Sequence, residues 1–202
     1  MQAFLSVLSI PFILLNAFGG IASGIWLGIL GQWSAIGQGL LAVLLSTFIL
    51  GFAMMPGLIF AAPAALLAQK GKLILAFPFM LLGLLYTYAV IVIWCMSVFY
   101  FFMQQSNAAS FWPLLIWSYG IALGSLMSIA QREQQSGNGE GSTMTTFFAQ
   151  IAYVIMALVA IFARVSLLDL VITFSGVMLV GMLIQTVIAV AIMIEQRRLG
   201  EI

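Results

Sequence analysis

Long apolar runs separated by short polar segments make up nearly the whole chain. A window of about 20 residues, set by a hydrocarbon core of about 30 Å and a rise of about 1.5 Å per helical residue, marks six such runs. They cover residues 3–31, 39–68, 73–103, 111–130, 146–163 and 167–194. The pattern predicts an all-α, polytopic membrane protein with six transmembrane helices in one integral membrane domain, residues 1–202.

The polar segments between these runs are short. They are Gln32–Gln38, Gln69–Lys72, Gln104–Ser110, Gln131–Thr145 and the turn around Arg164–Ser166. The fourth contains the Gly/Ser-rich stretch SGNGEGS at Ser136–Ser142, a composition typical of a flexible connector. None of them offers room for a soluble catalytic domain.

Composition supports the membrane interpretation. Hydrophobic residues make up 64% of the chain and charged residues 5%, whereas a soluble domain has about 25% charged residues. The mean hydropathy is +1.24. We therefore expect the lipid bilayer to surround the protein, and a net charge of +1 argues against a nucleic-acid partner.

The cations predict an orientation, because short loops on the cytoplasmic side retain Lys and Arg. Arg164 alone lies on the side reached after an odd number of crossings. Five cations lie on the other side, namely Lys70, Lys72, Arg132, Arg197 and Arg198. Both termini are therefore expected in the cytoplasm, and the expected location is the bacterial inner (cytoplasmic) membrane. The first run has no basic segment before it and is too long for a signal peptide, so we expect a retained first span.

Small residues recur every fourth position in two of the spans. The first span places glycines at Gly20, Gly24 and Gly28. The fourth repeats the spacing at Gly120, Gly124 and Ser128. Residues four apart drift by only about 40° around a helix, so each set forms one shallow groove. In lipid such grooves let two helix backbones approach closely, which predicts helix packing through both stripes.

The same two stretches allow a repeat hypothesis. GIASGIWLG, starting at Gly20, aligns with GIALGSLMS, starting at Gly120, and each lies in the first span of a three-span half. Since three is odd, such halves would have opposite orientations, as in the three-plus-three inverted repeats of many transporters. The composition favours the alternative, two independent packing grooves, because short matches among Gly, Ala, Ile and Leu arise easily in such a chain.

The second span contains Pro56 and Pro63, and a kink or break is expected near Pro56 and Gly57. In lipid, the carbonyls freed by a break need protein partners or a water-lined cavity, so a break is one mark of a functional interior. An ordinary proline kink is the alternative.

Residues for catalysis are scarce. The chain has no histidine and one cysteine, Cys95, which leaves no internal disulfide and no usual Cys/His metal site. Its glutamates all lie near the predicted cytoplasmic face, so paired-carboxylate and Ser-His-acid schemes both fail. We expect neither an enzyme nor a bound cofactor.

Four polar or ionic residues are candidates for a site. Asn16 lies one turn before Gly20, and Gln185 lies within the last span. Each amide either bridges neighbouring helices or contacts a substrate. Arg164 and Asp169 flank the last turn, where they either pair with each other or line an aqueous path.

Two functions remain. The first is a non-enzymatic subunit of a transport, channel or secretion-type membrane assembly, with other membrane subunits or further copies of the chain as partners. The alternative is a self-contained small-solute transporter with a midplane site near Pro56, Asn16 and Gln185. In size and number of spans the chain resembles the small substrate-binding subunits of energy-coupling importers, a resemblance that carries no shared motif.

Overall fold

The computed structural model describes residues 2–135, 139–163 and 166–198, and within them the chain is helical apart from short turns. The elements, in order, are α1 (Gln2–Ile29), α2 (Trp33–Met54), the 3₁₀ turn η1 (Met55–Gly57), α3 (Leu58–Gln69), α4 (Leu73–Met103), α5 (Phe111–Gln135), α6 (Gly139–Phe162) and α7 (Leu167–Arg198).

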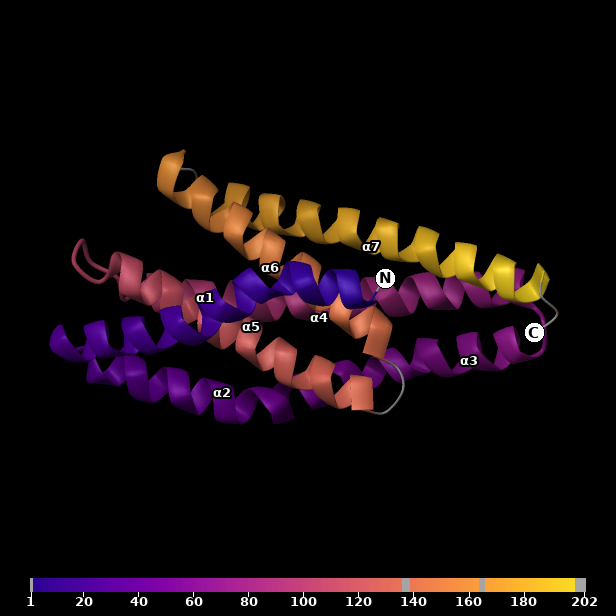
Figure 1. The fold of residues 1–202 in the computed structure, drawn as a ribbon, viewed down its shortest axis with the longest axis horizontal. Coiled ribbons are helices and arrows are strands. Elements are labelled where there is room, and N and C mark those ends of the chain that lie inside the picture. The colour runs from indigo at the N-terminus through magenta and orange to yellow at the C-terminus, as the bar shows by residue number, and fades with distance from the viewer. Residues whose placement is uncertain (1, 136–138, 164–165, 199–202) are drawn as a thin grey trace.

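The helices lie roughly along one common direction; α2 continues through η1 into α3, and the chain reverses direction between successive membrane-length helices (Figure 1). The α1–α2 turn, the α4–α5 connection and the facing ends of α6 and α7 lie toward one end of the bundle. The α3–α4 turn and the last turns of α7 lie at the other end. The C-terminal end of α5 and the N-terminal ends of α1 and α6 lie short of that second end (Figure 1).

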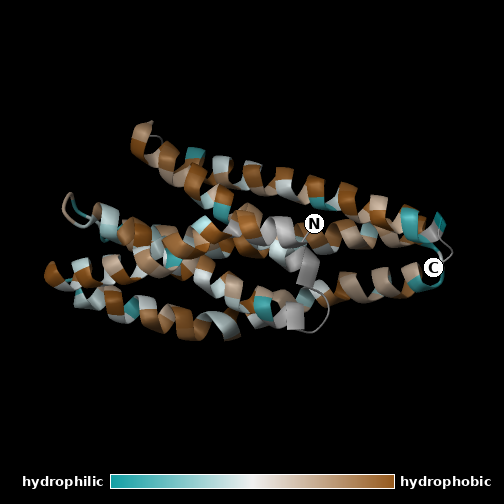
Figure 2. Ribbon diagram, viewed as in Figure 1, coloured by the Kyte–Doolittle hydropathy of each residue, from teal (hydrophilic) through white to brown (hydrophobic). Residues whose placement is uncertain are grey.

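Six stretches of the described residues are long and apolar enough to cross a membrane. They are Ile10–Ile29, Trp33–Gln69, Leu73–Met103, Phe111–Gln131, Thr143–Phe162 and Leu167–Gln196. Hydrophobic residues run along the lengths of the helices (Figure 2). The predicted all-α fold with six membrane-length helices is confirmed at this level, and the fold is compatible with an integral membrane protein. The inverted repeat stays a prediction.

The predicted polar connectors are too long. Gln32–Gln38 is mostly helix, since α2 begins at Trp33 and the turn consists of Leu30, Gly31 and Gln32, with Gly31 in a left-handed conformation at φ 73°. α5 continues to Gln135, and Gly139–Ser142 belongs to α6, so most of the expected flexible connector is helical and only 136–138 lie outside the described residues. Gln, Arg and Glu are good helix formers, so polarity marks where an apolar span ends and not where the helix ends.

The helix changes at Pro56, where the 3₁₀ turn η1 separates α2 from α3 while Met54, Met55, Gly57 and Leu58 keep right-handed helical backbone angles. Pro56 has no N–H to donate, and the Met55 N–H donates to the Phe52 carbonyl, three residues back. The Tyr86 hydroxyl of α4 donates to the Ala53 carbonyl at 2.6 Å, so a neighbouring helix satisfies a carbonyl at the break. Pro63 lies within α3, which continues through it.

α5 forms the centre of the bundle, where α1, α2, α4 and α6 all pack against it. The buried Tyr153 ring of α6 meets Tyr119 of α5, Phe99 of α4 and Phe174 of α7 edge-on. The Tyr153 hydroxyl also shares a 2.6 Å hydrogen bond with that of Ser118. This core joins α4, α5, α6 and α7 and leaves α3 at the periphery.

Candidate functional site

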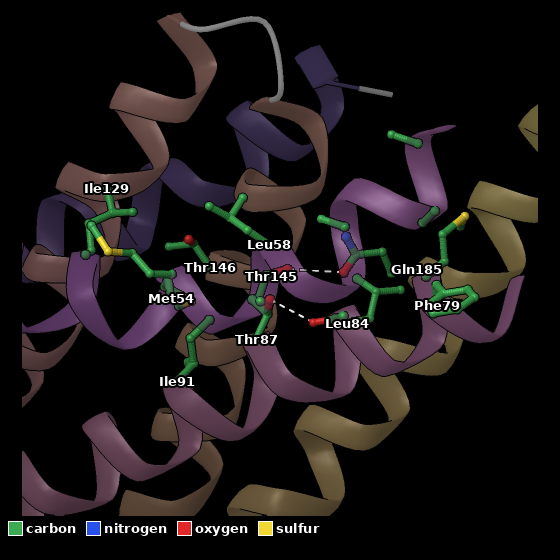
Figure 3. A pocket seen from close by; sticks show the side chains of 18 of the residues that line it. Met54, Leu58, Phe79, Leu84, Thr87, Ile91, Ile129, Thr145, Thr146 and Gln185 are labelled. Carbon is green, nitrogen blue, oxygen red and sulfur yellow. Dashed lines mark hydrogen bonds between the residues drawn. The ribbon is translucent and has the colours of Figure 1, made fainter. Parts of the chain in front are cut away.

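A cavity of about 710 Å³ lies beside the helix break (Figure 3). Small side chains form the wall supplied by η1 and α3, namely Gly57, Ala61, Ala64, Ala65 and Ala68. α4 contributes residues including Gly83, Leu84, Thr87 and Ile91. Leu126 and Ile129 of α5, Thr145 and Thr146 of α6, and Gln185 of α7 complete the opposite side.

Exposure differs between the rim and the interior of this cavity. Among the lining residues, Met55, Leu58 and Phe79 are 56%, 64% and 36% exposed. In contrast, Thr145 and Thr146 are only 4% and 7% exposed. The rim is therefore apolar and open, and hydroxyl groups lie at the closed end.

Hydrogen bonds hold the polar end in place. The Gln185 side-chain oxygen accepts from the Tyr88 hydroxyl at 3.0 Å and from the Thr145 hydroxyl at 3.1 Å, which joins α4, α6 and α7 (Figure 3 shows the bond to Thr145). The Thr87 hydroxyl donates to the Gly83 carbonyl at 3.0 Å. The amide oxygen of Gln185 is thus fixed by two helices other than its own.

The chemistry of the lining is neutral. Of the described residues that line the cavity, none is charged. A charge placed at membrane depth without a partner costs about 2.5 to 3.5 kcal/mol on insertion scales. Sites for small molecules measure about 300 to 1,000 Å³ and combine apolar walls with a few polar groups, as this cavity does. Within the described ranges no cluster of three or more His, Cys, Asp and Glu offers a metal site.

The structure separates the two candidate amides. Gln185 and the break at Met55–Gly57 share the cavity described above. Asn16 lines a second cavity of about 330 Å³ between α1, α2 and α5. There it covers the small residues of α5, since a Cβ built on Gly120 would lie 3.3 Å from the Asn16 side-chain oxygen.

The two small-residue stripes meet where α1 crosses α5. A Cβ on Gly120 would lie 4.0 Å from the Cα of Gly20, and one on Gly24 would lie 3.2 Å from the Trp117 ring of α5. Gly124 faces Asn16. The remaining two members have other neighbours, since Gly28 lies against Trp33 and the Ser128 hydroxyl donates to the Ser125 carbonyl of its own helix.

Asp169 lies in the first turn of α7, where its carboxylate accepts hydrogen bonds from the Ser166 hydroxyl at 2.7 Å and the Ser166 N–H at 3.2 Å. The Asp169 N–H donates in return to the Ser166 hydroxyl oxygen at 3.4 Å, which makes a capping box, and a carboxylate there also suits the helix dipole. Arg164 lies outside the described residues, so its pairing with Asp169 stays a prediction.

Sequence reasoning overlooked most of the cavity. Thr145 fell inside the segment predicted to be a connector, although it lies in α6 and bonds to Gln185. The alanines of α3 were part of an apolar run. Their spacing at 61, 64, 65 and 68 places them on one helical face, which is the one signal that points to a small-residue wall.

No protein-family model, no curated protein and no solved structure matches the chain.

Proposed function

We propose that the chain is a self-contained small-solute transporter whose binding site is the cavity beside the helix break. The observation that carries the proposal is the position of the polar end. Tyr88 lies midway between Leu73 and Met103, the two ends of α4, and hydrogen bonds to Gln185 at the cavity wall, while Thr145 on the other side lies two residues after the start of the membrane-length stretch Thr143–Phe162. In secondary transporters, substrate sites lie near the bilayer midplane where a helix is discontinuous.

Support also comes from the kind of discontinuity. α2, η1 and α3 form one membrane-length path that is interrupted beside the cavity, and Gly57 at the interruption lines it. A change from α-helical to 3₁₀ hydrogen bonding within a membrane helix frees backbone groups, which need a partner from a neighbouring helix or a place at a cavity.

The orientation belongs to the same proposal. Lys70, Lys72 and Arg198 lie toward one end of the bundle, which we assign to the cytoplasm of a bacterial inner membrane together with both termini. Reporter fusions after Gly139 and at the C terminus are expected to report a cytoplasmic position. An external signal from either one would overturn this orientation.

A ligand screen tests the binding site. The purified protein in mild detergent is heated with a panel of uncharged small molecules, and stabilising compounds are retested on Ala61→Phe, which fills part of the cavity, and on Ala62→Phe. Both alanines are exposed and adjacent in α3, but Ala62 does not line the cavity. We expect the stabilisation to disappear in Ala61→Phe and to persist in Ala62→Phe. Equal stabilisation of the two variants would reject the cavity as the site.

The second test is transport itself. A stabilising compound is expected to cross vesicles that contain the wild-type protein and Ala62→Phe faster than vesicles that contain Ala61→Phe. If no compound stabilises the protein and it purifies as a homo-oligomer or with a membrane partner, the hypothesis of an assembly subunit replaces the transporter.

A further inference from the structure

We infer that the cavity takes a neutral, single-chain amphiphile, with a hydroxyl or carbonyl end and an apolar tail, directly from the bilayer. The inference rests on the proposed binding site and adds the class of its ligand and the route of entry.

The lining of the cavity changes from apolar at the rim to polar at the closed end. The exposed rim consists of apolar residues, Met55 and Leu58 beside the break and Phe79 in α4. The closed end carries the buried hydroxyls of Thr145 and Thr146 together with the half-buried Gln185. A water-soluble solute would need the opposite order, with polar groups at the rim, because the entrance must replace the hydrogen bonds that the solute makes to water. An amphiphile fits with its polar end inward and its tail toward the rim.

The position of the rim indicates the route of entry. Leu58 and Phe79 belong to two different membrane-length stretches, Trp33–Gln69 and Leu73–Met103. α5 ends and α6 begins short of the end of the bundle that carries the α3–α4 turn (Figure 1), so α3 and α4 extend beyond them. The rim is therefore presented to acyl chains of the leaflet nearest the Lys70–Lys72 turn.

Among the residues that the structure describes, no charged side chain lines the cavity. The described residues that line the cavity offer only hydroxyl, amide and apolar groups. A hydroxyl or carbonyl group finds hydrogen-bonding partners there, whereas a phosphate, carboxylate or ammonium finds no counter-charge. The alanines of α3 and Gly57 of η1 have small side chains, so they leave room for apolar tails of different shapes.

A photolabelling experiment tests the inference. Wild-type protein in lipid vesicles is irradiated with an octadecanol that carries a diazirine in its chain, and the modified residues are mapped by mass spectrometry. Octadecanol, octadecane and octadecyl sulfate are added as competitors with the same chain and a neutral, absent or charged end. We expect adducts on cavity residues, with octadecane competing about fivefold more weakly for lack of the hydrogen bond. The sulfate is expected to compete about a hundredfold more weakly because its charge has no partner.

Three variants sharpen the result. Ala61→Phe is expected to lose the cavity adducts, while Ala62→Phe keeps them. Ala65→Phe, also at an exposed lining position, serves in place of Ala61→Phe if that variant does not fold. Thr146→Val, nearly equal in shape, is expected to keep the adducts but reduce the preference for octadecanol over octadecane.

Several outcomes would overturn the inference. These are adducts spread over the lipid-facing surface, equal competition by octadecyl sulfate, and an unchanged pattern in both filled-cavity variants. If a water-soluble compound stabilises the wild type but not Ala61→Phe, and no cavity adduct forms, the inference fails while the proposed site stands. Cavity adducts without vesicle transport of any stabilising compound would support the inference and reject the transporter.

Discussion

Small residues gather in two regions of the molecule, and they do different things in each. In the first, which we term the packed crossing, α5 crosses α1 and α2 through Gly24, Gly39 and Gly120. In the second, which we term the cavity wall, Gly51 of α2 and the alanines of α3 face an open space. The residue types are similar, but only the first region places a second backbone or a large ring opposite them.

The difference follows from which helices lie opposite. At the packed crossing, Trp117 of α5 reaches over Gly39 and donates a hydrogen bond to the Ala35 carbonyl at 3.2 Å, so side chains of α5 fill the space at the Cβ position of Gly39. Opposite the cavity wall, α5 ends and α6 begins, and their residues Ile129 and Thr146 form the far side of the cavity. Small residues permit close packing between helices. Close packing occurs only where another helix lies opposite them at the same level along the bundle.

The largest expected effect breaks the packed crossing at Gly39. A Cβ there would overlap the Trp117 indole nitrogen and lie 2.7 Å from the Ile121 side chain. Overpacking typically costs about 1 to 3 kcal/mol, and we expect Gly39→Leu at the upper end of this range. Thermal unfolding in detergent measures the loss. Gly37→Leu, two residues away and with open space around it, is the control and is expected to unfold near the wild-type temperature. A similar loss in both variants would remove the packing explanation.

A second comparison sets one glycine of each region against the other. Gly24 has the Trp117 ring 3.2 Å from its Cβ position, whereas Gly51 lines the cavity with nothing within 4 Å. We expect Gly24→Leu to lower the stability by about 2 kcal/mol through overpacking, and Gly51→Leu to leave it nearly unchanged. The unfolding temperatures of the two variants, measured side by side, decide the point. If Gly51→Leu is the more damaging, the two regions do not differ as described.

The third prediction concerns the polar end of the cavity. Gln185→Leu removes the acceptor of two hydrogen bonds, and interhelical hydrogen bonds in membranes average about 0.6 kcal/mol, so we expect a loss of about 1 kcal/mol. Tyr88→Phe removes one of them and should cost about half as much. In the double variant, unfolding measurements should give less than the sum of the two losses, because both changes remove the same bond. Strict additivity would indicate that Tyr88 and Gln185 do not interact.

The smallest effect is expected at the break itself. Tyr86→Phe removes the donor to the Ala53 carbonyl while keeping the ring, which lies 3.3 Å from the Cβ position of Gly57. We expect a loss of about 0.6 kcal/mol in unfolding experiments. Tyr100→Phe, which loses an exposed hydrogen bond to the Leu167 carbonyl, is the matched control and should lose less. A greater loss of stability in Tyr100→Phe would show that the Tyr86–Ala53 hydrogen bond does not stabilise the turn at η1 as described.

The sequence predicts the spans and the break because both depend on local chemistry. Apolar runs are set by the thickness of the bilayer, and Pro56 cannot donate the hydrogen bond that its position in a helix requires. The cavity depends instead on where α5 and α6 end relative to α4 and α7, which hydropathy does not record. Leu27, fully buried, and Ile25, 62% exposed, also look alike in the sequence, because core-facing and lipid-facing residues are both apolar.

Native mass spectrometry of the protein released from lipid nanodiscs tests most directly whether the cavity holds a discrete ligand within the membrane. We predict one adduct of defined mass on the wild-type protein and on Ala62→Phe, and none on Ala61→Phe. A wild-type protein free of adducts, or the same adduct retained by Ala61→Phe, would contradict the account.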